Sequence, residues 1–170
     1  MTEVEKLVQE AQNHKAVNHP YLFALEDGSL NNPELAIKDF SLQYSGYTSW
    51  FPRYLTAAIS KISNPSHRKH LLDNLSEENG NIDAEEIMLL KELGIEEEWV
   101  QGISHPELFK RFQKALGTKD NIEIDVATAI WREMFLNVVY NGSEAEVIGA
   151  IGIGTESIVK YIYKHITLGI

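Results

Sequence analysis

The sequence contains no cysteine, which excludes disulfide bonds, thiolate zinc sites, iron–sulfur clusters and a cysteine nucleophile. Basic residues are also scarce, since 15 lysines and arginines stand against 25 acidic residues, and this balance argues against a nucleic-acid partner. No apolar run reaches the roughly 18 residues of a membrane span, and the acidic N-terminal segment has no signal-peptide core. We therefore expect a cytoplasmic protein.

Apolar residues recur at steps of three and four along most of the chain, which is the spacing of one helix face. With capping residues, prolines and glycines at the ends, this pattern predicts helices over 34–62, 65–78, 83–94, 106–117, roughly 124–140, and from 143 nearly to the C-terminus. Pro52 lies inside the first of these helices, where it predicts a kink and not a stop. Because no strand pattern or internal repeat is visible, we predict an all-α fold, a helical bundle that forms one domain over residues 1–170.

The negative charge is concentrated in one segment of the chain. Between Glu77 and Glu98, nine acids accompany a single base, Lys91, so this segment carries −8 of the net charge of −10. We interpret it as the solvated face of a short helix; a rim that attracts cations is the alternative interpretation.

Glu156 is the only charged residue over 147–159, in a segment rich in isoleucine and valine. A carboxylate on such a surface needs a partner, because burying an unpaired charge is unfavourable by several kcal/mol. That partner is a base, a metal ion or a retained proton; otherwise Glu156 is a structural acid, buried or at the helix edge. Gly149, Gly152 and Gly154 lower helix propensity, and such glycines are usually kept for close helix packing or for space beside a ligand.

Glu78 and His105 are two further candidates for a site. Helical phase turns Glu78 toward the apolar stripe that contains Leu75, whereas the neighbouring Glu77 points away from it. His105 shares a helix face with Phe109, and a position at a helix N-terminus favours a neutral imidazole that can bind a metal. Each candidate has a simpler alternative, because the acids can end a helix in solvent and the histidine can be a cap.

Together, Glu78, His105 and Glu156 offer carboxylate oxygens and one imidazole from three helices, a donor set that suits iron or manganese. The sequence has no nucleophile elbow for Ser/His/Asp hydrolysis and no phosphate-binding loop. We therefore predict a metal site with no catalytic side chains beyond its ligands.

An ordered set of four segments carries a family resemblance: FSLQYSGYTSWFPRYLTAAISKI (40–62), RKHLLDNLSEENG (68–80), HPELFKRFQKALG (105–117) and GTESIVKYIYKHI (154–166). The set resembles the haem-oxygenase-like di-iron oxidase family. Relatives of that family include the chlamydial death-domain-associating protein and, more distantly, the pyrroloquinoline-quinone synthesis oxidase and the thiaminase-like proteins. The resemblance implies a seven-helix bundle that holds one or two irons between three core helices. It implies metal ligands at Glu78 (or Glu77, with a different gap), His105 and Glu156.

The chain departs from the family pattern at its C-terminus. The family's third core helix carries a His-x-x-x-Asp-x-x-His series, which is absent from this sequence before its last residue, Ile170. Either the chain continues past this point or the protein has lost the third metal-bearing core helix. We expect the domain to be incomplete at the C-terminus, because the apolar last helix would otherwise lack its neighbour.

The function that the resemblance implies is a non-haem iron-dependent oxidase or oxygenase, which activates O2 to oxidise a small organic metabolite. Two alternatives stay open: a cofactor-free oxidase of the quinone-synthesis type, and a non-catalytic helical binding protein that has lost the metal site. The expected partners are the small-molecule substrate and O2, without nucleic acid or membrane, and a homodimer stays open.

Overall fold

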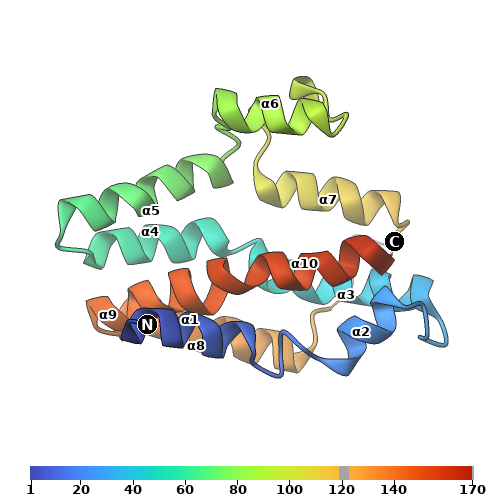
Figure 1. Ribbon diagram of the computed structural model, residues 1–170, viewed down its shortest axis with the longest axis horizontal. Helices are drawn as coiled ribbons and strands as arrows, with labels where there is room; N and C mark the ends of the chain where they lie inside the picture. The colour runs from blue at the N-terminus through green and yellow to red at the C-terminus, as the bar shows by residue number, and fades with distance from the viewer. Residues whose placement is uncertain (119–122, 170) are drawn as a thin grey trace.

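The structure is a computed structural model that describes residues 1–118 and 123–169. Within these residues every regular element is a helix and none is a strand, which confirms the all-α class (Figure 1). In chain order the elements are α1 (Glu3–Gln12), α2 (Pro20–Glu26), α3 (Pro33–Thr48), α4 (Phe51–Lys61), α5 (Pro65–Glu78), α6 (Ala84–Glu92), the 3-10 turn η1 (Glu97–Trp99), α7 (His105–Ala115), α8 (Val126–Asn141), α9 (Glu144–Ile148), the π-helix η2 (Gly149–Glu156) and α10 (Ser157–Gly169).

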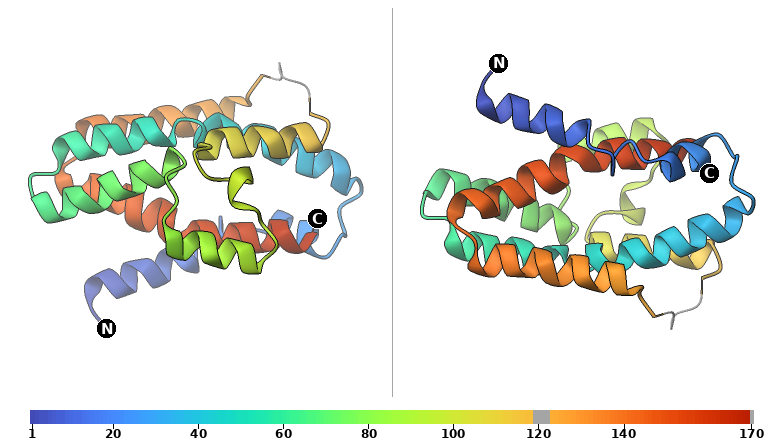
Figure 2. Two further views of the ribbon diagram at one scale, coloured as in Figure 1. Left: turned by 90° about the horizontal axis from the view of Figure 1, so that it is seen from above. Right: turned by 90° about the horizontal axis from the view of Figure 1, so that it is seen from below.

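The helices α3 and α4 follow one another along the middle of the molecule (Figure 1). α5 packs on α4, α7 packs on α3, and α8 contacts both α3 and α4. The C-terminal run of α9, η2 and α10 starts against α4 and α8 and ends against α2. α6 and η1 form an excursion at the outer edge, between α5 and α7 (Figure 1 and Figure 2). The end of α5, the start of α7 and the junction of η2 with α10 therefore meet around one pocket.

Pro52 separates two helices, so the predicted single kinked helix over 34–62 is wrong. α3 ends at Thr48, and α4 begins at Phe51 with Pro52 in its first turn. Proline has no N–H to donate to the carbonyl of Thr48, whereas in a first turn this missing donor costs nothing. The chain instead makes a tight turn in which Trp50 N donates to Tyr47 O at 3.1 Å.

The local signals at other helix ends are confirmed. α5 spans the predicted 65–78, and its first turn is capped by Asn64, whose side chain accepts from Ser66 N at 2.8 Å. Ser143 and Glu146 form both halves of the predicted capping box at the start of α9. Such ends are set by a few neighbouring residues, which is why the sequence predicts them well.

The C-terminal run is not the uniform helix that its sequence predicts, because its middle part is a π-helix of 8 residues. The segment contains all three glycines that lie near Glu156 in sequence. A Cβ added at Gly149 or Gly152 would meet no atom within 4 Å, so these glycines do not serve close helix packing. Short π-helical segments are frequent at functional sites, and this one ends at Glu156.

Two clusters of buried side chains stabilise the bundle. The larger joins α4, α8, α9 and η2 through Tyr54, Leu55, Ala58, Phe135, Val139, Val147 and Ile151. The smaller joins α2, α3 and α10 through Leu25, Ile37 and Ile166. Each fully buried side chain of this size contributes about 1.5–3 kcal/mol. The clusters fix the helices that carry the candidate site.

The acidic segment lies outside these clusters. Of its acids only Glu78 is half-buried, and the other eight are exposed, which agrees with the interpretation as a solvated face. Among the helices that the structure describes, none combines the length and the apolar character of a membrane span.

Candidate functional site

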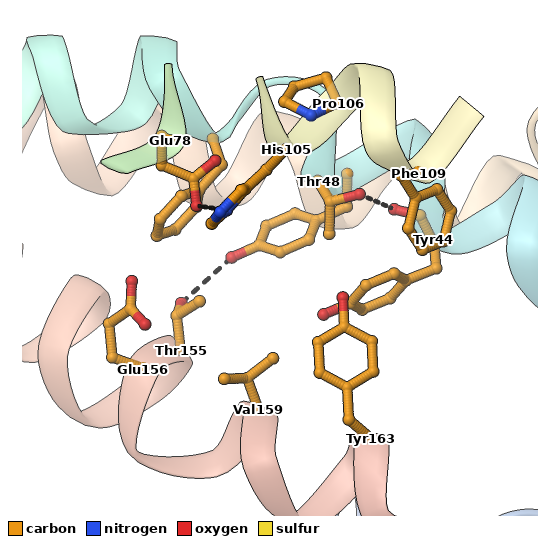
Figure 3. A pocket seen from close by; sticks show the side chains of 12 residues that line it. Tyr44, Thr48, Glu78, His105, Pro106, Phe109, Thr155, Glu156, Val159 and Tyr163 are labelled. Carbon is orange, nitrogen blue, oxygen red and sulfur yellow. Dashed lines mark hydrogen bonds and ion pairs between the residues drawn. The ribbon is translucent and has the colours of Figure 1, made fainter. Parts of the chain in front are cut away.

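One pocket of about 210 Å³ brings the three predicted ligands together (Figure 3). Glu78 comes from the end of α5, His105 from the start of α7, and Glu156 from the end of η2. The remaining walls are mostly apolar or aromatic; they are Tyr44, Tyr47, Thr48, Phe51, Pro106, Phe109, Thr155, Val159 and Tyr163. None of the described lining residues is a lysine or an arginine.

Glu78 and His105 meet because the chain returns to its starting point after the α6 excursion. Gly102 N donates to Gly80 O at 2.8 Å, and Gly80 has φ of +91°. A Cβ on Gly80 would lie 2.5 Å from Ile103 N, so only glycine fits this closure. His105 Nδ1 then donates to Glu78 Oε1 at 2.9 Å, across 27 positions of sequence. The structure places Glu78, and not the exposed Glu77, in the pocket.

The pair is open to the pocket on its histidine side. The Glu78 side chain is 14% exposed and that of His105 is 50% exposed, so the ring keeps access to a ligand. The hydrogen bond to Glu78 raises the pKa of His105 above its ordinary value, against the opposing effect of partial burial. With Nδ1 engaged in this bond, the second ring nitrogen, Nε2, stays free in the neutral form.

Glu156 faces the pair from the C-terminal run (Figure 3). Its carboxylate accepts from Asn74 Nδ2 at 2.9 Å. The adjacent Thr155 exchanges a hydrogen bond of 3.1 Å with the Tyr47 hydroxyl. Glu156 itself is exposed, so it is not a buried structural acid. The carboxylate therefore lines the pocket on the side opposite Glu78 and His105.

The tyrosines of the pocket keep their protons. Burial raises the pKa of Tyr47 to about 12. Burial, together with the neighbouring Tyr163, raises the pKa of Tyr44 far above its ordinary value. These hydroxyls are hydrogen-bond donors at neutral pH and do not supply negative charge to the site.

Comparison of the sequence with models of known protein families gives one match. Residues 38–170 match the model of the haem-oxygenase-like family described as iron-containing redox enzyme. The chain belongs to this family. The match covers all three predicted ligands and supports the resemblance at the level of the family, without distinguishing among the relatives named above. Searches of curated proteins and of solved structures found no match to the chain.

The donor chemistry of the pocket fits the metal that this iron-containing redox family implies. Imidazole nitrogen and carboxylate oxygen are donors that iron accepts, and His105 and Glu78 each present one of these groups to the pocket. Glu156 is separate: among the described residues, no three histidine or carboxylate side chains lie close enough together to hold a metal ion. Metal ligation by these residues stays a prediction.

Three residues at the site were not predicted from the sequence: Thr155 and Tyr163, which line the pocket, and Asn74, which donates to Glu156. Asn74 lies one helical turn before Glu78, and Tyr163 lies two turns after Glu156, so both share a face with a predicted ligand. Thr155 is the direct neighbour of Glu156. Helical spacing from the candidate ligands is therefore the signal that finds Asn74 and Tyr163 in the sequence.

Proposed function

We propose that this iron-containing redox enzyme is an oxidase or oxygenase that uses O2 to oxidise a small organic metabolite, with Glu78, His105 and Glu156 as iron ligands. One observation carries the proposal: an imidazole and a carboxylate of 2.9 Å separation lie in a pocket whose other walls are mostly apolar. A second carboxylate, that of Glu156, lines the same pocket from the opposite side. Carboxylate and imidazole donors are those of non-haem iron sites.

The chain's own residues have separable roles in this proposal. Bound iron supplies the redox chemistry with O2. Glu78, His105 and Glu156 would hold the metal, and the hydrogen bond from His105 Nδ1 to Glu78 fixes the orientation of the imidazole ring. Asn74 orients Glu156 through its amide. Phe51, Phe109 and other apolar walls exclude water from the reacting groups.

Anaerobic loading with Fe(II), followed by desalting and metal analysis, tests the proposal. Wild type is expected to retain iron, and Glu78→Ala and Glu156→Ala to retain much less. Glu77→Ala is the matched control, because it removes the same charge one residue away from an exposed position. The proposal is wrong if wild type retains no iron, or if the Glu77 and Glu78 variants retain equal amounts.

A second candidate function is the cofactor-free oxidase, which needs tyrosine or basic side chains around its substrate. Three tyrosines, Tyr44, Tyr47 and Tyr163, line the pocket and favour it, whereas the described lining contains no lysine or arginine. Oxygen consumption with a candidate substrate in the presence of an iron chelator separates the two. Activity that survives chelation supports the cofactor-free reaction, and activity that is lost supports the iron enzyme.

A further inference from the structure

Two consecutive hydrogen bonds connect the π-helix η2 to the opposite wall of the pocket. The Thr155 hydroxyl donates to Ala150 O at 3.1 Å. The Tyr47 hydroxyl lies 3.1 Å from the same threonine oxygen. Because a threonine hydroxyl carries a single proton, which here goes to Ala150, Tyr47 is the donor of the second bond. The connection therefore runs from Tyr47 of α3 through Thr155 to the backbone of η2.

This connection matches the π form of the segment and not an α-helix. In an α-helix a threonine hydroxyl bonds to the carbonyl three or four residues before it, whereas Ala150 lies five residues before Thr155. The backbone has the same spacing, since Ser157 N donates to Gly152 O. The bond from Thr155 to Ala150 therefore depends on the wide turn, and it is expected to break if the segment winds as an α-helix.

The two ends of the connection differ in how firmly they are held. The Tyr47 ring is buried and packs against Tyr54 and Phe135, at 5.4 and 5.5 Å between ring centroids. In the described segment Gly149–Glu156, by contrast, three residues are glycine and only Ile151 is buried. Glycine has the greatest backbone freedom of all residues. The local sequence of η2 therefore determines its turn only weakly, and Tyr47 offers it a fixed attachment point.

The turn of η2 determines where the Glu156 carboxylate lies, because Thr155 directly precedes Glu156 beside the pocket (Figure 3). We propose that Tyr47 is a positioning residue for Glu156. Its hydroxyl, acting through Thr155, holds η2 in the π form and so keeps the Glu156 carboxylate in the pocket, where it accepts from Asn74 Nδ2 at 2.9 Å. The inference rests on the proposed function only for the role of Glu156 as a metal ligand.

The test follows the contact between Asn74 and Glu156 in the metal-free protein by two-dimensional NMR. The side-chain amide signal of Asn74 reports this contact, and Glu156→Ala gives the position of the signal without the acceptor. Tyr47→Phe and Thr155→Val each remove one hydroxyl and keep the shape of the side chain. Both are expected to move the Asn74 signal toward that reference. Both are also expected to lower the protection of the η2 amides from hydrogen exchange by about two- to tenfold.

Two further variants separate the connection from a general loss of packing. Thr155→Ser keeps the hydroxyl and is expected to leave the Asn74 signal at its wild-type position. Ser157→Ala is the matched control, because the Ser157 hydroxyl donates to Ile153 O at 2.7 Å within its own run of helix and does not reach the opposite wall. It is expected to leave the signal and the amide protection unchanged.

The double variant Tyr47→Phe/Thr155→Val is expected to behave as either single variant does, because both changes break the same connection. An unmoved Asn74 signal in either single variant, an equal movement in Ser157→Ala, or additive effects in the double variant would each overturn the proposal. These readouts do not depend on iron. If wild type retains no iron while the Asn74 signal moves as expected, the proposed function is wrong and the positioning of Glu156 by Tyr47 is supported.

Discussion

Two histidine–glutamate pairs join helices in this molecule, and they differ in what surrounds them. His105 of α7 donates through Nδ1 to Glu78 of α5, and His165 of α10 donates through Nδ1 to Glu26 of α2. The His165 side chain is 13% exposed and that of His105 is 50% exposed. The chemical groups are the same, so the surroundings decide the role of each pair.

The pair of His165 and Glu26 belongs to a tightly packed contact. The His165 ring stands edge-on to Phe23, with 4.9 Å between centroids. A Cβ on Gly169 would lie 2.4 Å from Leu25 O, so α10 and α2 approach closely. At His105 the ring instead lines the pocket. A histidine that is enclosed by packing holds two helices together. A histidine that lines a pocket instead has a ring nitrogen available to bind a ligand.

The largest expected effect separates the pairs by iron affinity. His105→Ala is expected to weaken Fe(II) binding by about 100-fold or more, since outer-shell changes alone cost 10- to 100-fold. His165→Ala is expected to leave the affinity unchanged within about twofold. Competition with a fluorescent chelator under anaerobic conditions measures both. Equal losses of Fe(II) affinity in the two variants would contradict the proposal that only His105 binds the metal.

Stability is expected to show the opposite order. His165→Ala removes the partner of Glu26 and a packed ring, and is expected to lower the free energy of unfolding by about 1–3 kcal/mol. His105→Ala removes a half-exposed ring and is expected to lower it by less than about 1 kcal/mol. Urea denaturation of the metal-free proteins, followed by circular dichroism, measures the difference. A larger loss in the His105 variant would contradict the assignment of His165 as the structural pair.

Asn74 tests whether the pocket side depends on a polar support. Asn74→Ala leaves Glu156 without the amide that orients it, so Fe(II) affinity is expected to fall by about tenfold. Asn137→Ala on the exposed face of α8 is the matched control and is expected to have no effect. Unchanged iron affinity in the Asn74 variant would contradict the claim that Asn74 orients Glu156 for metal binding.

The smallest expected effect is a pH dependence of the open pair. The folded-state pKa of His105 lies above its ordinary value of 6.5, so the pair stabilises the fold fully below that pH, and its contribution is lost as the pH rises through the raised pKa. The stability difference between wild type and His105→Gln is thus expected to be larger at about pH 5.5 than at about pH 8.5, by less than about 1 kcal/mol. Glu78→Gln is expected to flatten this dependence, and a difference that grows with pH would contradict the pairing.

Those parts of the fold that depend on neighbouring residues could be predicted from the sequence. The cap at Asn64, the capping box at Ser143 and the inward phase of Glu78 each follow from a few positions along one helix. The contact between Glu78 and His105 could be predicted only through the family resemblance. It depends on a tertiary contact, that of Gly80 with Ile103, which no local pattern in the sequence reveals.

The errors have physical reasons of the same kind. Pro52 can either kink a continuous helix or occupy the first turn of a new one. The chain adopts the second arrangement, because a tight turn at Trp50 ends α3 before Pro52. In the C-terminal run the predicted uniform helix assumed 100° per residue, whereas the wider turns of the π-helix η2 rotate each residue by less. The glycine-rich sequence of this segment does not reveal that change.

The hydrogen bond between Gly102 and Gly80 makes residues 81–101 a closed excursion, which leaves the bundle and returns to it at one point. α6 packs chiefly on η1, inside the same excursion. These residues, with seven acids and one lysine, therefore form a segment that we expect to tolerate replacement by a short turn or by an inserted domain. Gly80 and the start of α7 would still hold Glu78 and His105 in contact. For protein engineering, residues 81–101 are a segment that lies next to the candidate site without lining its pocket.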